Sequence, residues 1–593
     1  MDTQLISTHR LSDPLQGLAE HQAIGCLLNC YLREFALPVG QVEWQAGGDL
    51  PKALTSSLLA GEALRLILPA SQLKLALKAD RISLLGRARF SSAPFIKRFG
   101  QPWRLLSAME ACRLLLQEMA LQTGTPYNRE LDDQIANSTG ITRAFLAQAR
   151  TAQADSLLES EQALLWGHPM HPSPKSRHGV PMDELLACSP EVGASFPLCW
   201  FRVDEALWQH RGESAALTML EQLAEAPGLY PCHPWEVRHI LASPLYHKAE
   251  QSGLIAYLGP RGLPMYPTSS VRTLYRADLP YFLKCSIHVR LTNCVRKNAW
   301  YELESAVFMS ECLTPVLNSL EQANPGFALM REPAATSLDF SSLAEPEEQE
   351  QVRHLQECFG LLYRHNLSQS EQSSCEPTLA GALFAWGRFG QSQLVQRLND
   401  LARERSWSYQ DAALNWFSAY LNALVPGVLD ACFNHGVVFE PHLQNTLIGF
   451  EHGLPNRVWI RDLEGTKLLP EHWPAQRLQG LSERARASVH YSRDQGWNRI
   501  GYCLLVNNIS EAIFHLADGD ADLELTAWQQ LASTLQSWAS ANGRPAEIAE
   551  LLAGGPLPSK NNLKTRLLQK ADRLADYTLL PHPMLPHPIR ASL

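Results

Sequence analysis

The stretch from His435 to Gly465 constrains the fold of this chain most strongly. Two short apolar runs, Thr446-Leu447-Ile448 and Val458-Trp459-Ile460, lie on either side of residues rich in Gly, Pro and Asn. Two such runs around a turn predict a β-hairpin. Because the open ends of an antiparallel pair are neighbours, we expect Asn445, before the first run, to lie beside Asp462, after the second.

This pair of side chains predicts a metal site. An amide oxygen beside a carboxylate is an arrangement that holds Mg²⁺ on a nucleotide, and protein kinases use the same pairing. We therefore predict Asn445, Asp462 and the nearby Glu464 as Mg²⁺ ligands. The alternative is a buried polar turn, in which the backbone satisfies the His and Asn side chains.

Length and charge limit the classes of protein to consider. A chain of 593 residues with 45% hydrophobic content is large enough for several domains with a sizeable core. The formal net charge of −9 argues against nucleic acid as a general partner. Any anionic ligand must therefore be met by local basic clusters.

Targeting signals and cysteine usage favour a soluble protein of the cytoplasm. The first residues lack a basic segment followed by an apolar one, so we expect no signal peptide, and no apolar run approaches the ~20 residues that span a bilayer. The 13 cysteines are scattered and form no CxxC motif, which fits a reduced compartment.

A proline-rich loop carries the first basic cluster. The sequence GHPMHPSPKSRHG, from Gly167 to Gly179, cannot be helical because its prolines stiffen it. It presents imidazoles together with Lys175 and Arg177, and a stiff loop of this composition suits an anion because little entropy remains to be lost. The alternative is a solvated surface loop.

A second basic cluster follows at residues 266–296. The segment PTSSVRTL gathers hydroxyls around Arg272, a combination that suits phosphate or carboxylate oxygens. The alternation from Leu283 to Thr292 predicts one β-strand that places Lys284, Ser286, His288, Arg290 and Thr292 on one face. That face has two cations and no acid, so we expect an anion-lined cleft that Arg296 extends; a solvated face is the alternative.

The remaining sequence suggests three parts, and the predicted class is α+β. Residues 1–150 should form a small α+β domain, with a helix at about 15–35, strands at 64–68, 73–77 and 82–85, and a helix at 105–121. Residues 151–375 carry the basic cleft, and residues 376–593 are mostly helical. We expect the acidic segment 331–351 to be exposed or poorly ordered, residues 368–377 to be a boundary loop, and the helical stretch at 414–432 to break at Pro426-Gly427.

Six of these segments occur together and in order in one known family. GHPMHPSPKSRHG, HPWE, PTSSVRTL, KCSIHVRLTNCVR, EPHLQN and RDLEG resemble the IucA/IucC-type siderophore synthetases, which work without nonribosomal peptide synthetase machinery. The similarity runs from about Glu161 to Gly465 and continues more weakly through residues 502–507. The GHP-x-HP-x-x-K-x-R-x-G loop resembles the subgroup that acts on free citrate.

The resemblance implies a fold and a reaction. The fold is a cupped hand with thumb, fingers and palm, which would correspond to residues 1–150, 151–375 and 376–593. The activity is a ligase reaction in which ATP adenylates a carboxylate, usually of citrate, and an amine or hydroxyl then displaces AMP. ATP and Mg²⁺ are the expected cofactors, and we expect a cytoplasmic homodimer that binds neither nucleic acid nor membrane.

We assign the predicted site residues on both grounds. The catalytic residues are His442, Arg296 and Lys284. The ATP contacts are Ser270, Arg272, Thr273, Lys284, Arg296, Asn445 and Asp462. The contacts of citrate, or of a related polycarboxylate, are His171, Lys175, Arg177, Thr292, Arg296, Glu440 and His442. Citrate follows from charge matching, because cations that Mg²⁺-ATP does not use would be costly to bury unpaired beside a monocarboxylate.

Two other functions compete with this prediction. A kinase-like phosphotransferase would use the Asn445/Asp462 pair, although Glu440 and His442 depart from the kinase pattern, and it would release ADP where a ligase releases AMP and pyrophosphate. A non-catalytic binder of a ferric siderophore would neither hydrolyse nor exchange ATP.

Overall fold

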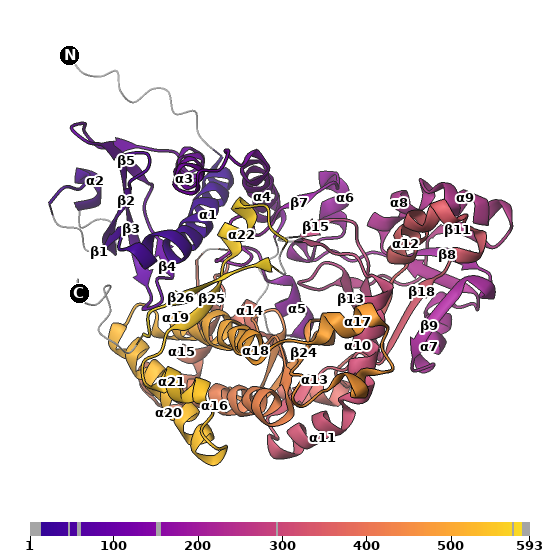
Figure 1. The fold of residues 1–593 in the computed structure, drawn as a ribbon. Coiled ribbons are helices and arrows are strands. Elements are labelled where there is room, and N and C mark those ends of the chain that lie inside the picture. Colours follow the sequence, from indigo (N-terminus) through magenta and orange to yellow (C-terminus); the bar gives the residue numbers. More distant parts are fainter. Residues whose placement is uncertain are drawn as a thin grey trace.

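The computed structural model describes residues 13–44, 48–55, 61–149, 156–291, 294–388, 390–571 and 574–583. The fold mixes helix and sheet, with 50% of residues helical and 20% in strands, which confirms the predicted mixture. Figure 1 shows the N-terminal part, the segment around β8–β11 and the helical C-terminal part around a common centre. The cupped-hand arrangement and its three lobes stay a prediction.

The N-terminal part is an antiparallel sheet covered by helices α1 and α3. Helix α1 (Pro14–Tyr31) continues as a π-helical turn to Ala36, and α3 (Ala108–Thr123) begins at a capping box between Ser107 and Glu110. The sheet order is β1-β2-β3-β5-β6, with β4 on β3. The strands are β1 Val42–Trp44, β2 Glu62–Leu68, β3 Leu73–Ile82, β4 Ala88–Phe90, β5 Phe95–Arg98 and β6 Arg104–Leu105.

One predicted strand in this part is wrong. Ile82 ends β3, and residues 83–86 form a turn that closes at Gly86, whose φ is +73°. Leu84 and Leu85 are apolar because they are buried against the C-terminal helices, and the main-chain N–H of Leu84 donates to Glu524 Oε1 at 2.8 Å. An apolar run that fills a neighbouring core looks the same in sequence as a short strand.

The middle part contains a six-stranded sheet that supports the basic cluster. Its order is β12-β13-β14-β19-β18-β9, and each neighbouring pair is antiparallel. The strands are β9 Trp208–Gly212, β12 Tyr266–Pro267, β13 Thr273–Tyr275, β14 Tyr281–Cys285, β18 Ala334–Leu338 and β19 Leu361–His365. A smaller sheet, β10-β8-β11, lies beside α8, α9 and α12 on the right of Figure 1. Its strands are β8 Cys199–Val203, β10 Leu229–Cys232 and β11 Ile255–Pro260, and the helices are α8 Val237–Leu241, α9 Pro244–Gln251 and α12 Gln349–Cys358.

The single long strand predicted at Leu283–Thr292 is wrong. Strand β14 ends at Cys285, and β15 (Arg290–Leu291) pairs with β7 (Arg177–His178) and with β16 (Cys294–Val295) in a separate small sheet. All five residues of β14 are buried, so its alternation does not separate a core face from a solvent face. Thr292 lies outside the described residues.

Two predicted loops are ordered structure. The first half of the segment 331–351 contains β18, an interior strand between β19 and β9 whose five residues are all buried, and Glu332 is also fully buried. Residues 341–351 are exposed or half-buried, as expected. Residues 369–375 form helix α13, which Ser368 and Glu371 cap.

The predicted β-hairpin at residues 446–460 is confirmed. Strands β22 (Thr446–Glu451) and β23 (Leu454–Ile460) pair in register with Thr446 opposite Ile460. His452 and Gly453 close the hairpin with φ of +50° and +80°, as a two-residue type I′ turn requires. The hairpin belongs to the sheet β17-β23-β22-β20, where β17 is Phe327–Leu329 and β20 is Thr378–Leu379.

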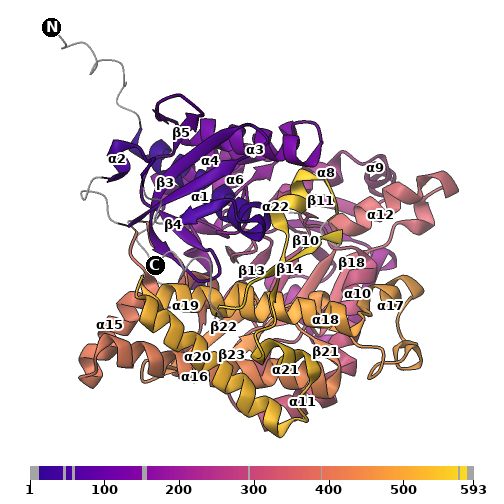
Figure 2. The same ribbon diagram turned by 60° about the vertical axis from the view of Figure 1, so that its left-hand side comes forward.

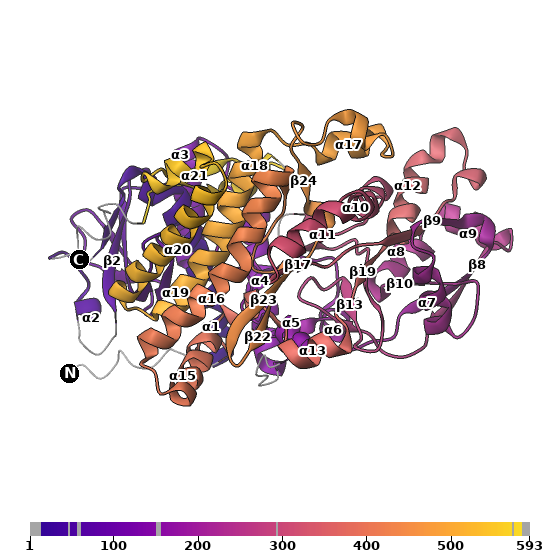
Figure 3. The same ribbon diagram turned by 90° about the horizontal axis from the view of Figure 1, so that it is seen from below.

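Helix α16 (Tyr409–Leu429) packs on β23 and passes through Pro426, so the predicted break there is wrong. The residues around Pro426 are buried, and this burial outweighs the single hydrogen bond that proline removes. Gly427 is needed for packing, because a Cβ there would lie 2.3 Å from a ring atom of Phe327. Figure 3 shows α16 beside α20 and next to the hairpin.

Further helices belong to the C-terminal part, and α15 and α20 among them pack directly on α16. They are α15 Gln393–Arg405, α17 Glu483–Val489, α18 Arg493–Ile500, α19 Ser510–Ala517, α20 Ala521–Ala541 and α21 Ala546–Leu552. A nine-residue π-helical segment, Gly501–Ile509, joins α18 to α19. Figure 2 shows α18, α19 and α20 in front of the sheet. By length and composition alone, two segments could cross a membrane, Tyr409–Asn434 and Arg493–Ala517; they are 67% and 94% buried, as core helices of a soluble protein also are.

The end of the chain returns to the N-terminal part. After β25 (Leu557–Lys560), helix α22 (Asn562–Leu567) inserts Leu563 and Leu567 into the core beneath α1. Glu34 accepts hydrogen bonds from the main-chain N–H groups of Leu563 and Lys564 at 2.9 and 2.7 Å. Figure 1 shows α22 beside α1 and α4 (Arg129–Gln148). The domain limits 1–150, 151–375 and 376–593 stay a prediction, and α22 and the β17–β23 pair both cross them.

Candidate functional site

A polar cavity of about 400 Å³ lies at the junction of the three parts. Most of the predicted site residues line it, and they come from segments far apart in the sequence. They are His171, Lys175, Arg177, Ser270, Arg272, Thr273, Lys284, Arg296, Glu440, His442, Asn445 and Asp462. Glu464 accepts a hydrogen bond from Lys284, which lines the cavity.

Lys284 and two carboxylates form the centre of one wall. The Lys284 ammonium donates to Asp462 Oδ1 at 2.8 Å and to Glu464 Oε2 at 2.7 Å, and Lys284 is 4% exposed. Burial opposes its charge, but the two carboxylates raise the pKa of Lys284. Burial likewise opposes the charge of Asp462, and Lys284 and Arg364 hold the pKa of Asp462 well below its usual range. All three groups are therefore charged at neutral pH.

The same wall contains the oxygen donors that a Mg²⁺ ion prefers. Asp462 and Glu464 supply two carboxylates, and Asn445, which is 5% exposed, supplies an amide. The Asn445 Nδ2 atom is buried without a hydrogen-bond partner among the described residues. The orphaned Nδ2 group is a hydrogen-bond donor, so an acceptor such as a phosphate oxygen would satisfy it, whereas the amide oxygen of Asn445 is the atom that could bind a metal. The donor set fits the predicted metal, and Lys284 is the cation that the metal would displace.

Asp462 is held in a strained backbone conformation. Its φ is +82°, which is uncommon for a residue with a side chain, and such strain gathers at functional sites. The next N–H, of Leu463, donates to Glu332 Oε2 at 3.0 Å. Glu332 is fully buried and paired with Arg364 at 2.6 Å, which itself lies 3.8 Å from Asp462. This buried pair fixes the turn that aims Asp462 at Lys284.

The hydroxyl-rich segment forms a tight turn beside Lys284. Val271 has a φ of +68°, and Ser270 Oγ accepts from the main-chain N–H of Thr273 at 3.1 Å and donates to its Oγ1 at 2.7 Å. The Arg272 guanidinium donates to the main-chain oxygen of Arg296 at 3.0 Å and lies 3.9 Å from Glu464. The structure thus brings the predicted phosphate contacts to the carboxylate pair.

The proline-rich loop brings Lys175 and Arg177 together on a carboxylate that the sequence did not reveal. Glu191 Oε1 accepts from Lys175 Nζ at 2.6 Å and from Arg177 Nη2 at 2.5 Å, and all three side chains are buried. Burial lowers the pKa of Lys175. The premise that these cations are unpaired is therefore wrong, because Glu191 already balances one of the two charges.

Two imidazoles that face the cavity, those of His168 and His442, are neutral at physiological pH. Burial, reinforced by nearby cations, lowers the pKa of His442 to about 4. Burial and the neighbouring His171 and His442 lower the pKa of His168 to about 3. His442 lies 3.9 Å from Glu440, whose carboxylate is paired with Arg499. A neutral imidazole can donate or accept a hydrogen bond but carries no charge to balance an anion.

Two members of the predicted basic face lie elsewhere. Arg290 pairs with Glu130 of α4 at 3.3 Å, and His288 hydrogen-bonds Glu236 at 2.5 Å. The inference that the two cations of this face are unpaired is wrong, because each meets a carboxylate from a distant segment. Lys284 alone of these three residues lines the cavity.

Several residues that line the cavity were missed. Arg461 pairs with Glu161, 300 residues away, and the N-terminal part contributes Arg87, which is 3.3 Å from Glu511. The π-helical segment contributes further polar groups, and such segments often occur at functional sites. The missed lining residues include Gln22, Arg87, Arg364, Arg461, Arg499, Tyr502, Asn507 and Lys560. The RDLEG motif, which begins with Arg461, and the weaker similarity through residues 502–507 signalled some of them, whereas Lys560 was expected to be solvated.

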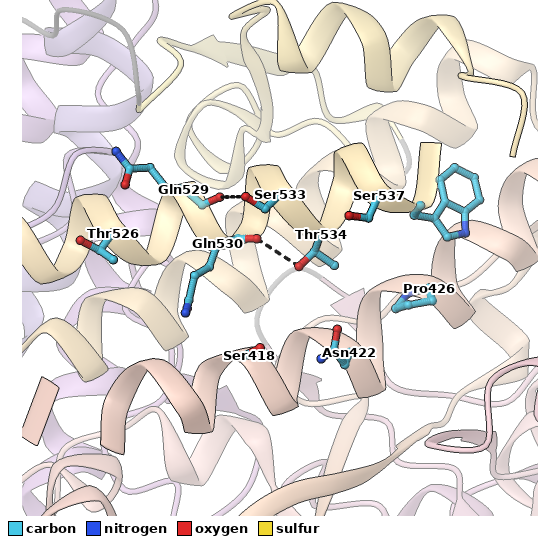
Figure 4. Close-up of a pocket in the computed structure, with 10 residues that line it drawn as sticks. Ser418, Asn422, Pro426, Thr526, Gln529, Gln530, Ser533, Thr534 and Ser537 are labelled. Atoms are coloured by element: carbon cyan, nitrogen blue, oxygen red, sulfur yellow. Dashed lines mark hydrogen bonds between the residues drawn. The ribbon is translucent and has the colours of Figure 1, made fainter. Parts of the chain in front are cut away.

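A second hollow, of about 490 Å³, lies between α16 and α20. Figure 4 shows its walls, where Ser533 donates to the main-chain oxygen of Gln529 and Thr534 to that of Gln530, both at 3.0 Å. Hydroxyls, amides, Pro426 and Trp538 line it, and none of the described residues that line it is charged. It lacks the charged groups that the predicted chemistry needs.

Comparisons with known proteins agree with the geometry. Residues 156–385 match the family described as IucA / IucC, and residues 414–575 match the one described as ferric iron reductase FhuF-like transporter. An N(2)-citryl-N(6)-acetyl-N(6)-hydroxylysine synthase of Vibrio mimicus is 30% identical over 425 residues, which cover 66% of this chain and 68% of that protein. The chain belongs to the IucA/IucC family. The resemblance seen in the sequence is thereby confirmed.

Alignments with other relatives cover more of this chain. An L-2,3-diaminopropanoate–citrate ligase of Staphylococcus aureus is 28% identical over 82% of the chain and 85% of that protein. A spermidine–citrate ligase of Bacillus anthracis is 26% identical over 93% and 94%. ATP-bound aerobactin synthetase IucA of Klebsiella pneumoniae has the same fold, with a TM-score of 0.80 and 22% identity over 95% of this chain and 100% of that one. The chain is an enzyme of the ligase class.

Proposed function

We propose that this enzyme uses ATP to adenylate a carboxylate of citrate and then joins the citryl group to an amine or hydroxyl acceptor, releasing AMP and pyrophosphate. The observation that carries the proposal is the pair of separate cationic clusters on one cavity. Lys284 and Arg272 lie beside the acidic group Asp462/Glu464, and Lys175 and Arg177 lie on Glu191. Two anions in one cavity are what an adenylation reaction requires. The named relatives that use citrate, and the relative with bound ATP, support this assignment.

The first cluster would bind the triphosphate. Ser270, Thr273 and Arg272 offer hydroxyl and guanidinium donors, and Lys284 would turn from its carboxylates to the phosphates. Asn445, Asp462 and Glu464 would hold Mg²⁺, which when bound supplies charge neutralisation at the phosphates. Arg296, which also lines the cavity, would face the α-phosphate, where negative charge develops and electrostatic stabilisation contributes most.

The second cluster would bind the polycarboxylate. The Lys175/Arg177/Glu191 group retains one positive charge, and His171, His442 and Glu440 line the same wall. Thr292, also predicted here, is outside the described residues. Neutral His442 would donate a hydrogen bond to an oxygen of the reacting groups and align the carboxylate with the α-phosphate, where orientation supplies much of the rate. A carboxylate is already ionised at neutral pH, so the first half-reaction needs no base.

Product analysis tests the reaction. We expect AMP and pyrophosphate, and hydroxylamine should trap citrate as its hydroxamate when ATP and Mg²⁺ are present. Succinate, 2-oxoglutarate and glutamate are the comparison substrates. Release of ADP would establish the kinase-like alternative, and absence of ATP turnover with any acid would leave a siderophore binder. Hydroxamate from glutamate but not from citrate would refute citrate and retain adenylation.

A variant tests the metal assignment. Asp462→Ala should abolish turnover with the fold intact, because it removes a carboxylate from the metal site and leaves Lys284 with Glu464. Near-normal activity with an unchanged Mg²⁺ requirement would remove Asp462 from this role.

We further propose that the enzyme works in the cytoplasm as a homodimer with three domains, without nucleic acid or membrane partners. Light scattering and sedimentation of the purified chain test the dimer.

A further inference from the structure

A second cluster of potential metal ligands lies away from the cavity, beside the small sheet β10-β8-β11. It consists of His288, after β14, and of His354 and Cys358 at the end of α12. One donor atom from each of the three residues can be chosen so that all lie within 4.8 Å of one another. Cys358 Sγ is 3.8 Å from His354 Nε2 and 3.8 Å from His288 Nδ1. Figures 1 and 2 show α12 at the far end of the molecule from α15 and α20.

Local structure explains why these side chains meet. His354 and Cys358 are four residues apart on α12, so they lie on one face of the helix. The HPWE motif supplies Glu236, which is fully buried and accepts from the main-chain N–H of His288 at 2.5 Å and from its ring at 2.5 Å. A third ring, His239 of α8, has its centroid 5.1 Å from that of His288. Neither the HPWE motif nor His288 takes part in the proposed adenylation site.

The hydrogen bonding of this cluster is incomplete. His288 Nε2 is buried without a hydrogen-bond partner among the described residues, and Cys358 is 2% exposed. Three imidazoles and a thiol thus pack together, and a carboxylate orients one of the rings. That ring, His288, is the one whose Nε2 atom has no hydrogen-bond partner among the described residues.

We propose that His288, His354 and Cys358 bind a zinc ion. Sulfur and imidazole donors together favour Zn²⁺ over Mg²⁺ or Ca²⁺, which prefer oxygen. Glu236 holds His288 Nδ1, as a carboxylate commonly holds a zinc-bound histidine, so Nε2 is the nitrogen that would bind the ion. Zinc–ligand distances of about 2.0–2.3 Å place tetrahedral donors roughly 3.5 Å apart, so side-chain movements would have to bring the donors, which lie within 4.8 Å of one another, into range. The side chains of His288 and His354 are partly exposed, so an ion can reach the cluster from the solvent.

The ion would stabilise the wall of the cavity that carries Arg296. The main-chain N–H of Ile287 donates to the oxygen of Arg296 at 2.9 Å, and the N–H of Arg296 donates to the oxygen of Val289 at 3.2 Å. These bonds flank His288. A metal that joins His288 to α12 therefore fixes the loop between Lys284 and Arg296. The role is structural, and it does not depend on the identity of the substrates.

Metal binding by the purified full-length chain tests the proposal. After removal of bound metals, Co²⁺ should give a thiolate-to-metal charge-transfer band at one ion per chain, and Zn²⁺ should displace it. Cys358→Ser should lose the band, and His354→Ala should bind at least tenfold more weakly. Glu236→Gln should weaken binding about 10- to 100-fold, the range for loss of a group that orients a ligand. Absence of a thiolate band in the wild type would refute the site.

Matched variants separate this site from adventitious metal binding elsewhere on the chain. Cys112→Ser removes an equally buried thiol on α3, and His247→Ala removes an exposed histidine on neighbouring α9; both should retain the cobalt spectrum. Asp462→Asn should retain it as well, which separates this ion from any bound in the nucleotide cavity. Unchanged binding in both Cys358→Ser and His354→Ala would refute the assignment. The wild-type spectrum reports on the thiolate even if one variant does not fold.

Discussion

Replacement of Lys284 by methionine tests the central wall of the cavity. Methionine has a similar length and no charge, so Asp462 and Glu464 would face each other without the ammonium that lies 2.8 and 2.7 Å from them. In the wild type, Lys284 occupies the position between these carboxylates that the proposed metal needs. The variant should therefore be less stable and should depend on a divalent cation for part of its stability.

The structure sets the size of the effect. Removal of one partner from a buried ion pair costs about 3–5 kcal/mol. Asp462 and Glu464 remain 29% and 25% exposed, and each retains a second cation, Arg364 at 3.8 Å and Arg272 at 3.9 Å. We therefore expect a smaller loss in the free energy of unfolding, about 2–3 kcal/mol. Mg²⁺ at about 100 times its dissociation constant would restore up to ~2.7 kcal/mol.

Urea unfolding with and without Mg²⁺ measures both effects. Lys175→Met is the matched control, because Lys175 is an equally buried lysine on a carboxylate, and Arg177 keeps that carboxylate, Glu191, paired. The control should lose stability without gaining a response to Mg²⁺. A loss below about 1 kcal/mol for Lys284→Met would contradict the assigned cost of the buried carboxylate pair. An equal Mg²⁺ response in both variants, or in neither, would contradict the metal assignment.

Two further predictions follow from local structure. Burial lowers the pKa of His442 to about 4 from 6.5, so between these pH values the unfolded chain binds more protons than the folded chain. The free energy of unfolding should therefore fall as pH drops through this window, and it should fall less steeply in His442→Gln. Identical slopes of the two proteins in denaturation experiments would refute the assignment. Gly427→Ala should cost about 1–3 kcal/mol through contact with Phe327 and be detected by calorimetry, whereas Gly17→Ala, on the open side of α1, should be neutral or stabilising.

Local pattern predicted local structure well. The β22–β23 hairpin follows from two apolar runs around a turn that needs positive φ at His452 and Gly453. The predicted N-terminal helices are present because their periodic apolar faces pack on the adjacent sheet. Short-range sequence patterns failed where packing against the core of a distant part of the chain determines the local structure. Leu84 and Leu85 look like a strand but fill the core of the C-terminal helices, and the short residues of β18 are interior despite their acidic flanks.

The types of site residue were predictable, but their partners were not. A cluster of cations in a chain of net charge −9 indicates an anion site, and most of the predicted residues line one cavity. Periodicity cannot reveal which carboxylate meets which cation. Glu191 follows Arg177 by 14 residues, and Glu161 lies 300 residues from Arg461, so tertiary structure alone brings each pair together. Glu191 hydrogen-bonds both Lys175 and Arg177 and balances one of their two charges, so the single net positive charge that remains does not by itself select a tricarboxylate.

The paired cations change how an anion can bind. Ten cationic side chains and four carboxylates line the cavity among the described residues: Arg87, Lys175, Arg177, Arg272, Lys284, Arg296, Arg364, Arg461, Arg499 and Lys560, with Glu191, Glu440, Asp462 and Glu511. Because Lys284 already holds Asp462 and Glu464, it can turn to a phosphate only if another cation takes these carboxylates. Mg²⁺ held by Asp462 and Glu464 would be that cation, and Lys284 would then be free to bind the phosphates. Nucleotide and metal would therefore each strengthen the binding of the other by the same factor.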